Sequence, residues 1–599
     1  MLGHSWFRCT SRMSPYAGIL CIVMVPVLAL RIDSQVRNCL VVDEGYHLVS
    51  GLRAWNDGTI NTYFVNPPLI RLLTSLPVYL SRHHYPRDMR SNDALRELIA
   101  LNGQRFWHLL LYARLVNTGL FLSGTWLVYR LASDIFNVRA GFVAALLWAS
   151  CPNISTMCDF VTCDLGASVF GLAAVYAFHC YVRCPTFLSA TVAGWVLGLA
   201  ELSKFTLLVL YPFLVFAWGF WYLIGNWRSP SSGAARMRFA HLIMMLLISL
   251  MAIGFFYAFQ GMGRTLGSYE FDSALLTVER NQKRVNRFED GWLGRFPVPL
   301  PALFVIGLDA QKADADVGRP AYLRGEWKHG GWWYYYLYAL LVKLPLGTLV
   351  LIVLSALLIL CSARFRGRVR EELLWAGPAA AVFLLITSET GINSHLRYIL
   401  PMLPFLFIGI SRVGLLLPTT VNWRSTKAPV ASLFGALVVA LALFHNGLDV
   451  ARIHPHYLSY FNELAGGPDH GWHHLLESNI DWGQDLFFLR DWLHDHPEAR
   501  PLRLAYYGGT DPHLLGIQYD LPPNEEDTPQ SGWFAVSVNF IGGAGFTGYD
   551  GEGNPTSFRP GAFQYFQHFT PVAKAGYSIF IYHVTSEEVN RSYSRIEQP

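Results

Sequence analysis

The sequence predicts a polytopic α-helical membrane protein with about eleven transmembrane helices and a C-terminal α/β domain on the outer face. Three observations support this fold class. Hydrophobic residues make up 52% of the 599 residues and charged residues only 15%, whereas soluble domains carry about 25% charge. The mean hydropathy is positive, at +0.29. From residue 450 onward the composition shifts toward Asp, Asn, Gly, Pro and His, which indicates a separate domain.

The scarcity of charge excludes several classes of protein. So few charged residues cannot cover the surfaces of several soluble domains, so most of the chain is expected to face lipid. Intrinsic disorder is excluded by the high apolar content. The net charge of +4, from 46 basic and 42 acidic residues, gives no argument for nucleic-acid binding.

Eleven apolar stretches could each form a transmembrane helix, which needs about 20 apolar residues. They lie near residues 15–32, 107–130, 140–156, 164–182, 187–203, 205–224, 238–259, 333–360, 372–388, 397–416 and 429–449. The first resembles a secretory signal, but its apolar run is long and no clear small-residue cleavage site follows it. We therefore interpret it as a retained anchor.

Lys and Arg in the short loops predict the orientation, because such residues accumulate on the cytoplasmic side. With Arg8 and Arg12 inside, every short basic loop also falls inside, and the loop 389–396 carries no Lys or Arg. Segments 33–106, 260–332 and 450–599 then lie outside. We expect a transmembrane domain over 1–449 and an extracytoplasmic α/β domain over 450–599, with strands at 502–507, 533–538 and 578–584 and a helix at 485–494.

Acidic residues mark the predicted outer boundary. Asp43 and Glu44 follow the first helix, where a carboxylate could act as a general base or could merely complement a helix dipole. His47 lies four residues after Asp43, so the two could share a helix face and a hydrogen bond. Asp164 opens the fourth helix, where either it or Thr162 could cap the helix, a role compatible with catalytic support.

Basic residues are expected at the same level. Lys204 lies between the fifth and sixth helices, Arg397 lies just before the tenth, and Lys343 lies inside the eighth apolar segment. Such residues often only extend to the lipid head groups. However, cations are also what a phosphate leaving group at a membrane surface requires. Acids and cations at one boundary therefore suggest group transfer from a lipid-linked phosphate.

Two further clusters favour ordinary explanations. The aromatic run 332–336 could stack on sugars, but it is more typical of an interfacial belt. Histidines 454, 456, 470, 473 and 474 lack the Cys or carboxylate spacing of a metal site. We therefore predict no metal-ligating residues.

Several short motifs occur in a characteristic order along the chain. They are Asp43-Glu44-x-x-His47, Pro67-Pro68-Leu69, Cys163-Asp164, Ser203-Lys204-x-Thr206, Gly331-Trp332-Trp333-Tyr334-Tyr335, Lys343-Leu344-Pro345 and His395-x-Arg397-Tyr398-x-x-Pro401. Through these motifs the chain resembles a polyprenyl-phosphate-dependent glycosyltransferase of the GT-C class. More narrowly it resembles the protein O-mannosyltransferase and aminoarabinose-transferase superfamily. The stretches 453–463 and 478–486 are similar to a bacterial branch, whereas Asn66 replaces the His that many relatives have before the Pro-Pro.

The resemblance implies an inverting transfer of a sugar from a polyprenyl-phosphate carrier to a hydroxyl of a protein, lipid or glycan. Asp43 would deprotonate or orient the acceptor hydroxyl as the base, and Glu44 and Asp164 would support the acceptor, the base or the sugar. Lys204 and Arg397 would stabilise the departing phosphate, and His47, Lys343, His395 and Tyr398 would complete substrate binding. No cofactor is certain, although a divalent metal is possible because the family varies. The expected location is the bacterial inner membrane, facing outward, with no nucleic-acid partner.

Two alternatives remain open. A transporter or flippase for a lipid-linked sugar should place charges near the bilayer midplane and often shows two related halves. The candidate charges instead gather at one boundary and no halves repeat, which favours the enzyme. A receptor or assembly factor would depend mainly on the outer domain, and replacing Asp43 would then leave its activity intact.

Overall fold

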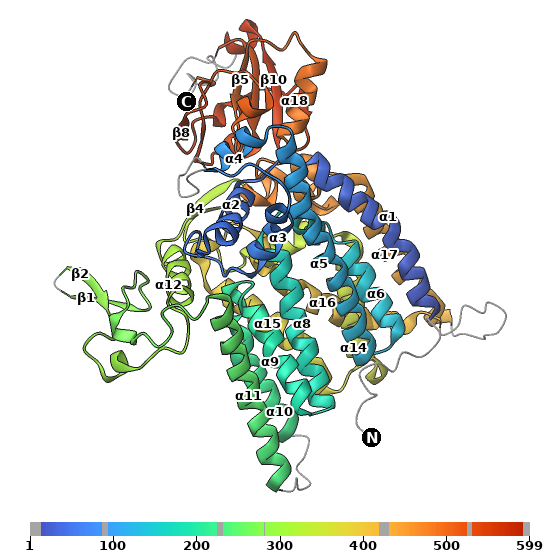
Figure 1. Cartoon of the computed structure of the whole chain (residues 1–599). Helices are drawn as coiled ribbons and strands as arrows, with labels where there is room; N and C mark the ends of the chain where they lie inside the picture. The colour runs from blue at the N-terminus through green and yellow to red at the C-terminus, as the bar shows by residue number, and fades with distance from the viewer. Residues whose placement is uncertain are drawn as a thin grey trace.

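Helices dominate the structure, a computed structural model that describes residues 14–86, 94–223, 232–280, 282–418, 430–523 and 530–590 (Figure 1). The α-helices are α1 (Pro15–Arg37), α2 (Val42–Asp57), α3 (Leu69–Leu80), α4 (Ala94–Asn102), α5 (Arg105–Ile135), α6 (Val138–Ala149), α7 (Pro152–Asp159), α8 (Cys163–Arg183), α9 (Phe187–Glu201), α10 (Leu210–Leu223), α11 (Ser232–Phe256), α12 (Ala302–Val317), α13 (Tyr335–Lys343), α14 (Leu346–Cys361), α15 (Val369–Ser388), α16 (Leu403–Ile410), α17 (Val430–Ile453), α18 (Leu486–Asp495) and α19 (Val538–Ile541).

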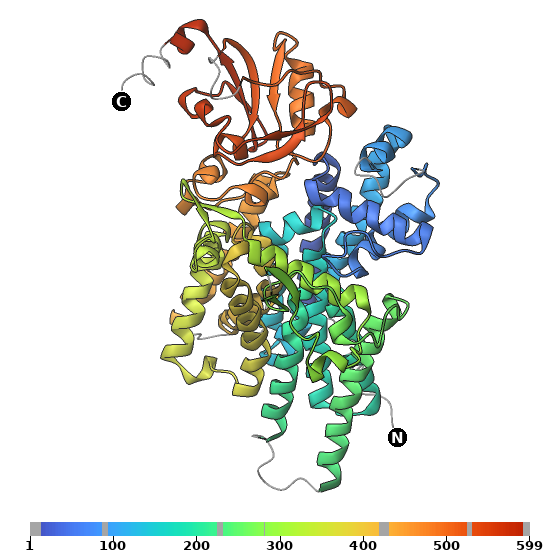
Figure 2. The same ribbon diagram turned by 90° about the vertical axis from the view of Figure 1, so that its left-hand side faces the viewer.

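The chain is a polytopic α-helical membrane protein. Among the described residues, six helices are long and apolar enough to cross a membrane, or up to eight if each of two bent helix pairs is one span. The long helices run roughly alongside one another below the strands of the C-terminal part (Figures 1 and 2). The predicted class is confirmed, and the count of eleven remains a prediction.

Two predicted single spans are broken helices. Residues 333–360 form α13 and α14 with a bend of 114°, and residues 140–156 fall in α6 and α7 with a bend of 58°. Proline residues explain both breaks, which correct the two predicted single helices. Pro345 forces the preceding Leu344 into an extended conformation, and Pro152 starts a new helix at its first position.

Glycines allow close helix packing within the bundle. A Cβ atom at Gly194 would lie 2.5 Å from the carbonyl oxygen of Met245, so α9 and α11 touch backbone to backbone. Gly347 brings α14 against α17 in the same way, because a Cβ atom added there would overlap the carbonyl oxygen of Ala442. Small residues at such positions let helices approach closely in lipid, where apolar burial gives no net drive to association.

Two short hairpins belong to the segment between α11 and α13. Strands β1 (Thr277–Arg280) and β2 (Lys283–Asn286) form one antiparallel pair, and β3 (Pro320–Leu323) and β4 (Glu326–His329) form the other. Helix α12 lies between the hairpins in the sequence. The carboxylate of its buried Asp309 accepts hydrogen bonds from the backbone N–H groups of Asp272 and Ser273, which ties the segment to the helix.

The C-terminal part contains a four-stranded mixed sheet in the order β5-β6-β10-β9. Its strands are β5 (Leu502–Ala505), β6 (Gly532–Ser537), β9 (Ala573–Ala575) and β10 (Ile579–Val584), and a separate hairpin joins β7 (Phe546–Tyr549) to β8 (Pro555–Phe558). Successive side chains of a strand point to opposite faces of the sheet, and here both faces are buried. Ile579 and Ile581 pack with α18, whereas Phe580 and Tyr582 face the opposite cluster. The predicted strands and helix of this region are present, and the domain boundary at 450 remains a prediction.

Candidate active site

A large cavity lies where the ends of several helices meet loops of the C-terminal part. Its volume is about 1410 Å³, more than the roughly 300–1,000 Å³ of a typical small-molecule pocket. The lining includes seven of the predicted site residues and a glycine-rich wall from the C-terminal part. These seven are Asp43, His47, Asp164, Lys204, His395, Arg397 and Tyr398.

Two acids and two cations form one continuous ion-pair network on this lining. Arg397 Nη1 donates to Asp43 Oδ2 at 2.8 Å and lies 3.7 Å from Asp164 Oδ2. Lys204 Nζ donates to Asp164 Oδ1 at 2.6 Å. The side chains of Asp164 and Lys204 are buried, whereas that of Asp43 is 23% exposed. Asp43 is therefore the more accessible acid of the pair.

Aromatic rings hold the two cations in place. The Arg397 guanidinium lies 4.2 Å from the centroid of the Trp482 ring, and Lys204 Nζ lies 5.1 Å from that of Tyr398. A cation above an aromatic face is stabilised by the ring quadrupole, most strongly where water is excluded. Trp482 comes from the C-terminal part, so this part contributes directly to the network.

Local structure explains why these residues converge. Asp43 and Asp164 each lie in the first turn of a helix, α2 and α8, where unpaired backbone N–H groups favour negative charge. Thr162, one of the two residues predicted to cap this helix, is the N-cap of α8. Lys204 is the extended N-cap of the 3-10 helix η1 (Phe205–Val209), and Arg397 lies in the first turn of η6 (Leu396–Met402).

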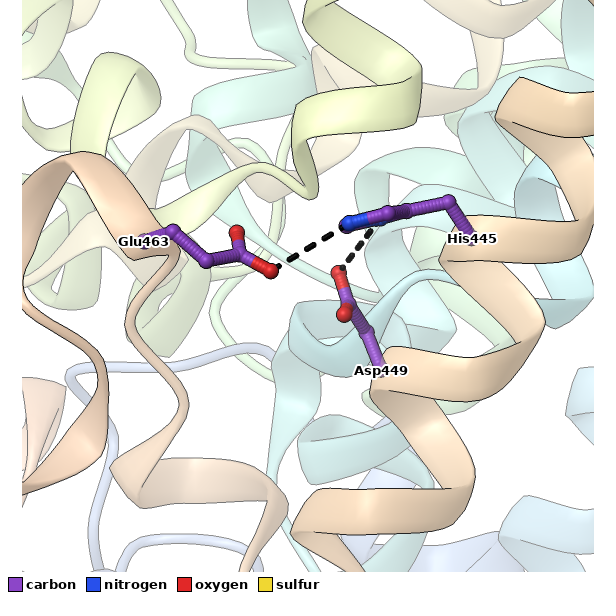
Figure 3. A group of neighbouring side chains, drawn as sticks. All are labelled: His445, Asp449 and Glu463. Carbon is purple, nitrogen blue, oxygen red and sulfur yellow. Dashed lines mark ion pairs between the residues drawn. The ribbon is translucent and has the colours of Figure 1, made fainter.

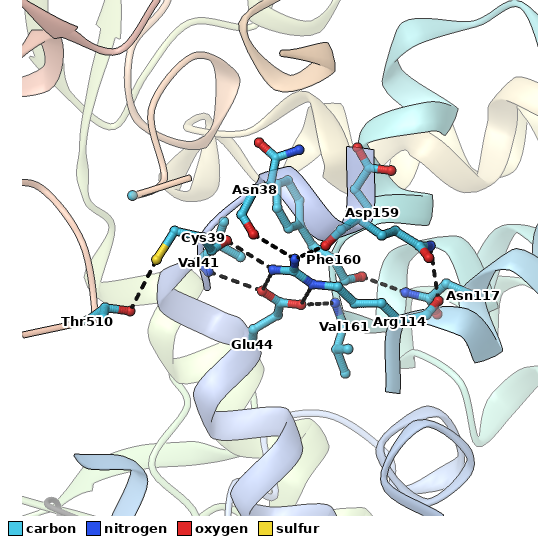
Figure 4. A network of polar contacts seen from close by, with 12 residues as sticks. Asn38, Cys39, Val41, Glu44, Arg114, Asn117, Asp159, Phe160, Val161 and Thr510 are labelled. Atoms are coloured by element: carbon cyan, nitrogen blue, oxygen red, sulfur yellow. Dashed lines mark hydrogen bonds and ion pairs between the residues drawn. The ribbon is translucent and has the colours of Figure 1, made fainter. Parts of the chain in front are cut away.

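Glu44 does not line the cavity, although it is adjacent to Asp43 in the sequence. Figure 4 shows its carboxylate facing Arg114 and the backbone of Val41 and Val161. Its fully buried carboxylate is bound by Arg114 Nε at 2.8 Å and Nη2 at 2.7 Å. It also accepts the backbone N–H groups of Val41 at 3.1 Å and Val161 at 2.9 Å. Glu44 therefore points away from the cavity that Asp43 lines, because successive residues on a helix point in different directions, and its predicted supporting role remains a prediction.

Lys343 also lies outside the large cavity. Its Nζ donates to the carbonyl oxygens of Leu458 at 2.8 Å and Asn479 at 2.7 Å, at the break between α13 and α14. It therefore joins the broken helix to the segment that leads into the C-terminal part. Substrate binding by Lys343 remains a prediction.

His47 lines the cavity without binding Asp43. Among the described residues, the side-chain hydrogen bond of Asp43 is to Arg397, so the expected Asp43–His47 hydrogen bond is absent. The His47 ring instead packs edge-on against Tyr63, at 5.0 Å between centroids. Burial lowers the pKa of His47 to about 4, so the ring is neutral near pH 7.

The structure adds lining residues that the sequence did not single out, chiefly Glu477 and Tyr507. Glu477 immediately precedes the family-like stretch 478–486, so its position next to that stretch was the available signal. His395 Nδ1 and Ser478 Oγ share a hydrogen bond of 2.6 Å, and His395 Nδ1 lies 3.8 Å from Glu477 Oε2.

One group of side chains outside the cavity has the chemistry of metal ligands (Figure 3). His445 Nδ1 lies 3.4 Å from Asp449 Oδ2, and His445 Nε2 lies 3.3 Å from Glu463 Oε1. One ligand atom from each of the three residues lies within 4.8 Å of the others, so the group could hold one metal ion through one ring nitrogen and two carboxylates.

Part of the chain matches a known protein family. The family model described as dolichyl-phosphate-mannose-protein mannosyltransferase matches residues 95–255. A comparison with curated proteins returned no match.

Three solved structures are similar to parts or most of this chain. ArnT from Cupriavidus metallidurans bound to undecaprenyl phosphate is 15% identical with a TM-score of 0.45, covering 95% of this chain and 99% of ArnT. The Saccharomyces cerevisiae Pmt1-Pmt2 complex bound to its sugar donor is 12% identical with a TM-score of 0.44, covering 74% and 90%. Archaeoglobus fulgidus AglB, with an inhibitory peptide and a dolichol-phosphate, is 14% identical with a TM-score of 0.43, covering 91% and 75%.

These TM-scores are too low to assign a function, and they leave the bacterial branch a prediction. The family match, by contrast, covers α4 to α11, including Asp164 and Lys204 of the ion-pair network. Residues 95–255 are thus similar to the family described as dolichyl-phosphate-mannose-protein mannosyltransferase, in agreement with the resemblance found in the sequence.

Proposed function

We propose that the protein transfers a sugar from a polyprenyl-phosphate carrier to a hydroxyl acceptor, with inversion, on the extracytoplasmic side. The single observation that carries this proposal is the network in which Arg397 and Lys204 lie against Asp43 and Asp164 on one cavity wall. Carboxylates and cations side by side supply what such a reaction needs: a base for the acceptor and a positive environment for the leaving phosphate.

In the proposed reaction, Asp43 accepts the proton of the acceptor hydroxyl as its oxygen attacks the anomeric carbon. The bond between that carbon and the phosphate oxygen breaks, and its electron pair stays on the departing polyprenyl phosphate. Arg397 and Lys204 stabilise that charge. A phosphate oxyanion needs no protonation to leave, so no general acid is required.

The network also suggests how donor binding would prepare the base. Arg397 Nη1 donates to Asp43 Oδ2, at 2.8 Å. A phosphate that binds Arg397 would compete with Asp43 for the same guanidinium donors. Asp43 would then be released toward the acceptor only when the donor is in place.

The experiment is transfer of label from a radiolabelled polyprenyl-phosphate sugar in membranes that contain the protein. We expect Asp43→Asn to abolish transfer and Arg397→Ala to reduce it strongly, both at normal protein levels. Equal transfer by Asp43→Asn and the unmodified protein would contradict the base assignment. No transfer by the unmodified protein, with several sugars tried, would contradict the proposed function.

A further inference from the structure

Glu477 is held in a strained backbone conformation on the cavity wall. Its φ angle is +56°, in the left-handed region that glycine adopts readily but glutamate rarely does. Among the described residues, five others share this feature: Tyr63, Ala258, Phe259, Gln282 and Arg324, of which the last two lie in the turns of the β1–β2 and β3–β4 hairpins. Glu477 instead begins the 3-10 helix η11 (Glu477–Asn479) on the cavity wall, and strain of this kind occurs often at functional positions.

Asn539 of α19 fixes this conformation from both ends of the segment. Its Oδ1 accepts the backbone N–H of Glu477 at 2.7 Å, and its Nδ2 donates to the carbonyl oxygen of Asp481 at 2.9 Å. Asn539 is fully buried. The C-terminal part thus holds the Glu477 backbone while its side chain lines the cavity.

The surroundings of Glu477 are those of a sugar site. His395 and Ser478 add polar groups next to its carboxylate. Aromatic residues Tyr507 and Phe546 line the same cavity, with ring centroids 4.2 Å apart. The neighbouring wall consists of the small residues Gly543, Ala544, Gly545 and Gly561, which leave room for a ring. Carboxylates bind sugar hydroxyls as hydrogen-bond acceptors, and aromatic rings supply rigid apolar contact area.

We propose that Glu477, with His395 and Ser478, forms an acceptor subsite that binds a hydroxyl-bearing sugar next to the Asp43 network. This inference rests on the proposed glycosyl transfer and names its acceptor class as a glycan. The cavity volume of about 1410 Å³ has room for such a group in addition to the head group of the donor. Glu477 acts as a positioning residue, because Asp43 remains the base.

The charged and titratable groups that face Glu477 are Arg319, Arg397, His395, Tyr335 and Tyr507. Burial raises the pKa of Glu477 to about 7, while the two arginines act in the opposite direction. Only the ionised carboxylate accepts hydrogen bonds through both oxygens. Binding of the sugar acceptor should therefore strengthen as the pH rises through about 7.

Because the Glu477 backbone is strained, a glycine variant can separate a role in acceptor binding from a role in folding. Glu477→Gly removes the carboxylate and relieves the strain, so the folded protein should be as stable as before or more so. Glu477→Gln keeps the shape and removes the charge. Gln282→Gly is the matched control, because it relieves the same kind of strain, at φ +62°, in an exposed hairpin turn.

The test uses the purified full chain with radiolabelled undecaprenyl-phosphate mannose as donor probe. Methyl mannoside and a serine- and threonine-containing peptide serve as acceptor probes, and release of free mannose by water reports on the donor side. We expect transfer to the glycoside but not to the peptide. Both Glu477 variants should lower kcat/KM for the glycoside by about tenfold or more, with donor hydrolysis and thermal stability retained. The fall of KM with rising pH should vanish in Glu477→Gln.

Several results would overturn the inference. Glycoside transfer that is unchanged in Glu477→Gly, or equally reduced in Gln282→Gly, would show that Glu477 has no part in binding the acceptor. Transfer to the peptide alone, or donor hydrolysis with neither acceptor used, would exclude a sugar subsite and leave the transferase function standing. Neither transfer nor hydrolysis by the unmodified protein would instead contradict the proposed function, and the acceptor subsite would fall with it.

Discussion

Replacing Glu44 should unfold the site without any direct effect on the reacting groups. The carboxylate is fully buried and receives four hydrogen bonds, two from Arg114 and two from backbone N–H groups. Arg114 also donates to the carbonyl oxygens of Gln35, Asn38 and Cys39. Glu44 therefore anchors the start of α2, which carries Asp43, to α5.

The expected magnitude follows from this geometry. Removing one partner of a buried ion pair costs about 3–5 kcal/mol, because the other charge is left uncompensated. Glu44→Ala should therefore lower the free energy of unfolding by about that amount. The neighbouring substitution Asp43→Asn should cost much less, since Asp43 is 23% exposed and Arg397 keeps its interaction with Asp164.

The assay is thermal unfolding of the purified full chain, followed by aggregation or intrinsic fluorescence, with transfer measured on the folded fraction. We expect Glu44→Ala to have a markedly lower Tm and Asp43→Asn to unfold near the unmodified protein but to transfer nothing. A Glu44→Ala protein that unfolds like the unmodified one yet has lost transfer would refute the structural role and place Glu44 in catalysis.

Three further predictions concern the fold. Lys343→Met should leave the carbonyl oxygens of Leu458 and Asn479 without their buried donor and lower the free energy of unfolding by about 1–3 kcal/mol. The KM for the donor should change by no more than roughly twofold. A large rise in KM with an unchanged Tm would instead indicate that Lys343 binds the substrate. Gly347→Ala should separate α14 from α17, because the added Cβ would overlap the carbonyl oxygen of Ala442. The free energy of chemical unfolding should fall by about 1–3 kcal/mol. An unchanged denaturant midpoint would contradict this packing. For His47, the pKa of about 4 in the folded state lies below the ordinary value of 6.5, so the unfolded chain takes up the proton first and stability should fall as the pH drops from about 6.5 toward 4. His47→Gln should lack that part of the acid sensitivity when Tm is measured against pH, and identical curves would argue against a buried neutral His47.

Much of the site was predictable from sequence because its charges are rare in an apolar chain. Asp43, Asp164, Lys204 and Arg397 stand out where few other charges occur, and the structure brings all four together. Sequence alone could not separate Asp43 from Glu44. Adjacent acids look alike in a motif, and only the position of Arg114 on α5 determines which of them turns away from the cavity.

The features that the sequence did not predict also have physical explanations. A continuous apolar run predicted one helix over 333–360, but hydropathy does not register that Pro345 ends α13 and redirects the chain by 114°. Glu477 and Trp482 lie far from Asp43 in sequence and reach the cavity only because the C-terminal part folds back onto the helix ends. Long-range closure of this kind leaves no periodic signal in the chain.

The anomeric configuration of the transferred sugar tests the central claim most directly. A polyprenyl-phosphate sugar of known configuration would be supplied to the purified protein, and the linkage in the product determined by NMR. A single displacement, with Asp43 as base and Arg397 and Lys204 at the leaving phosphate, predicts inversion. Retention of configuration would contradict it, because retention requires a covalent intermediate or a second displacement that this arrangement does not provide.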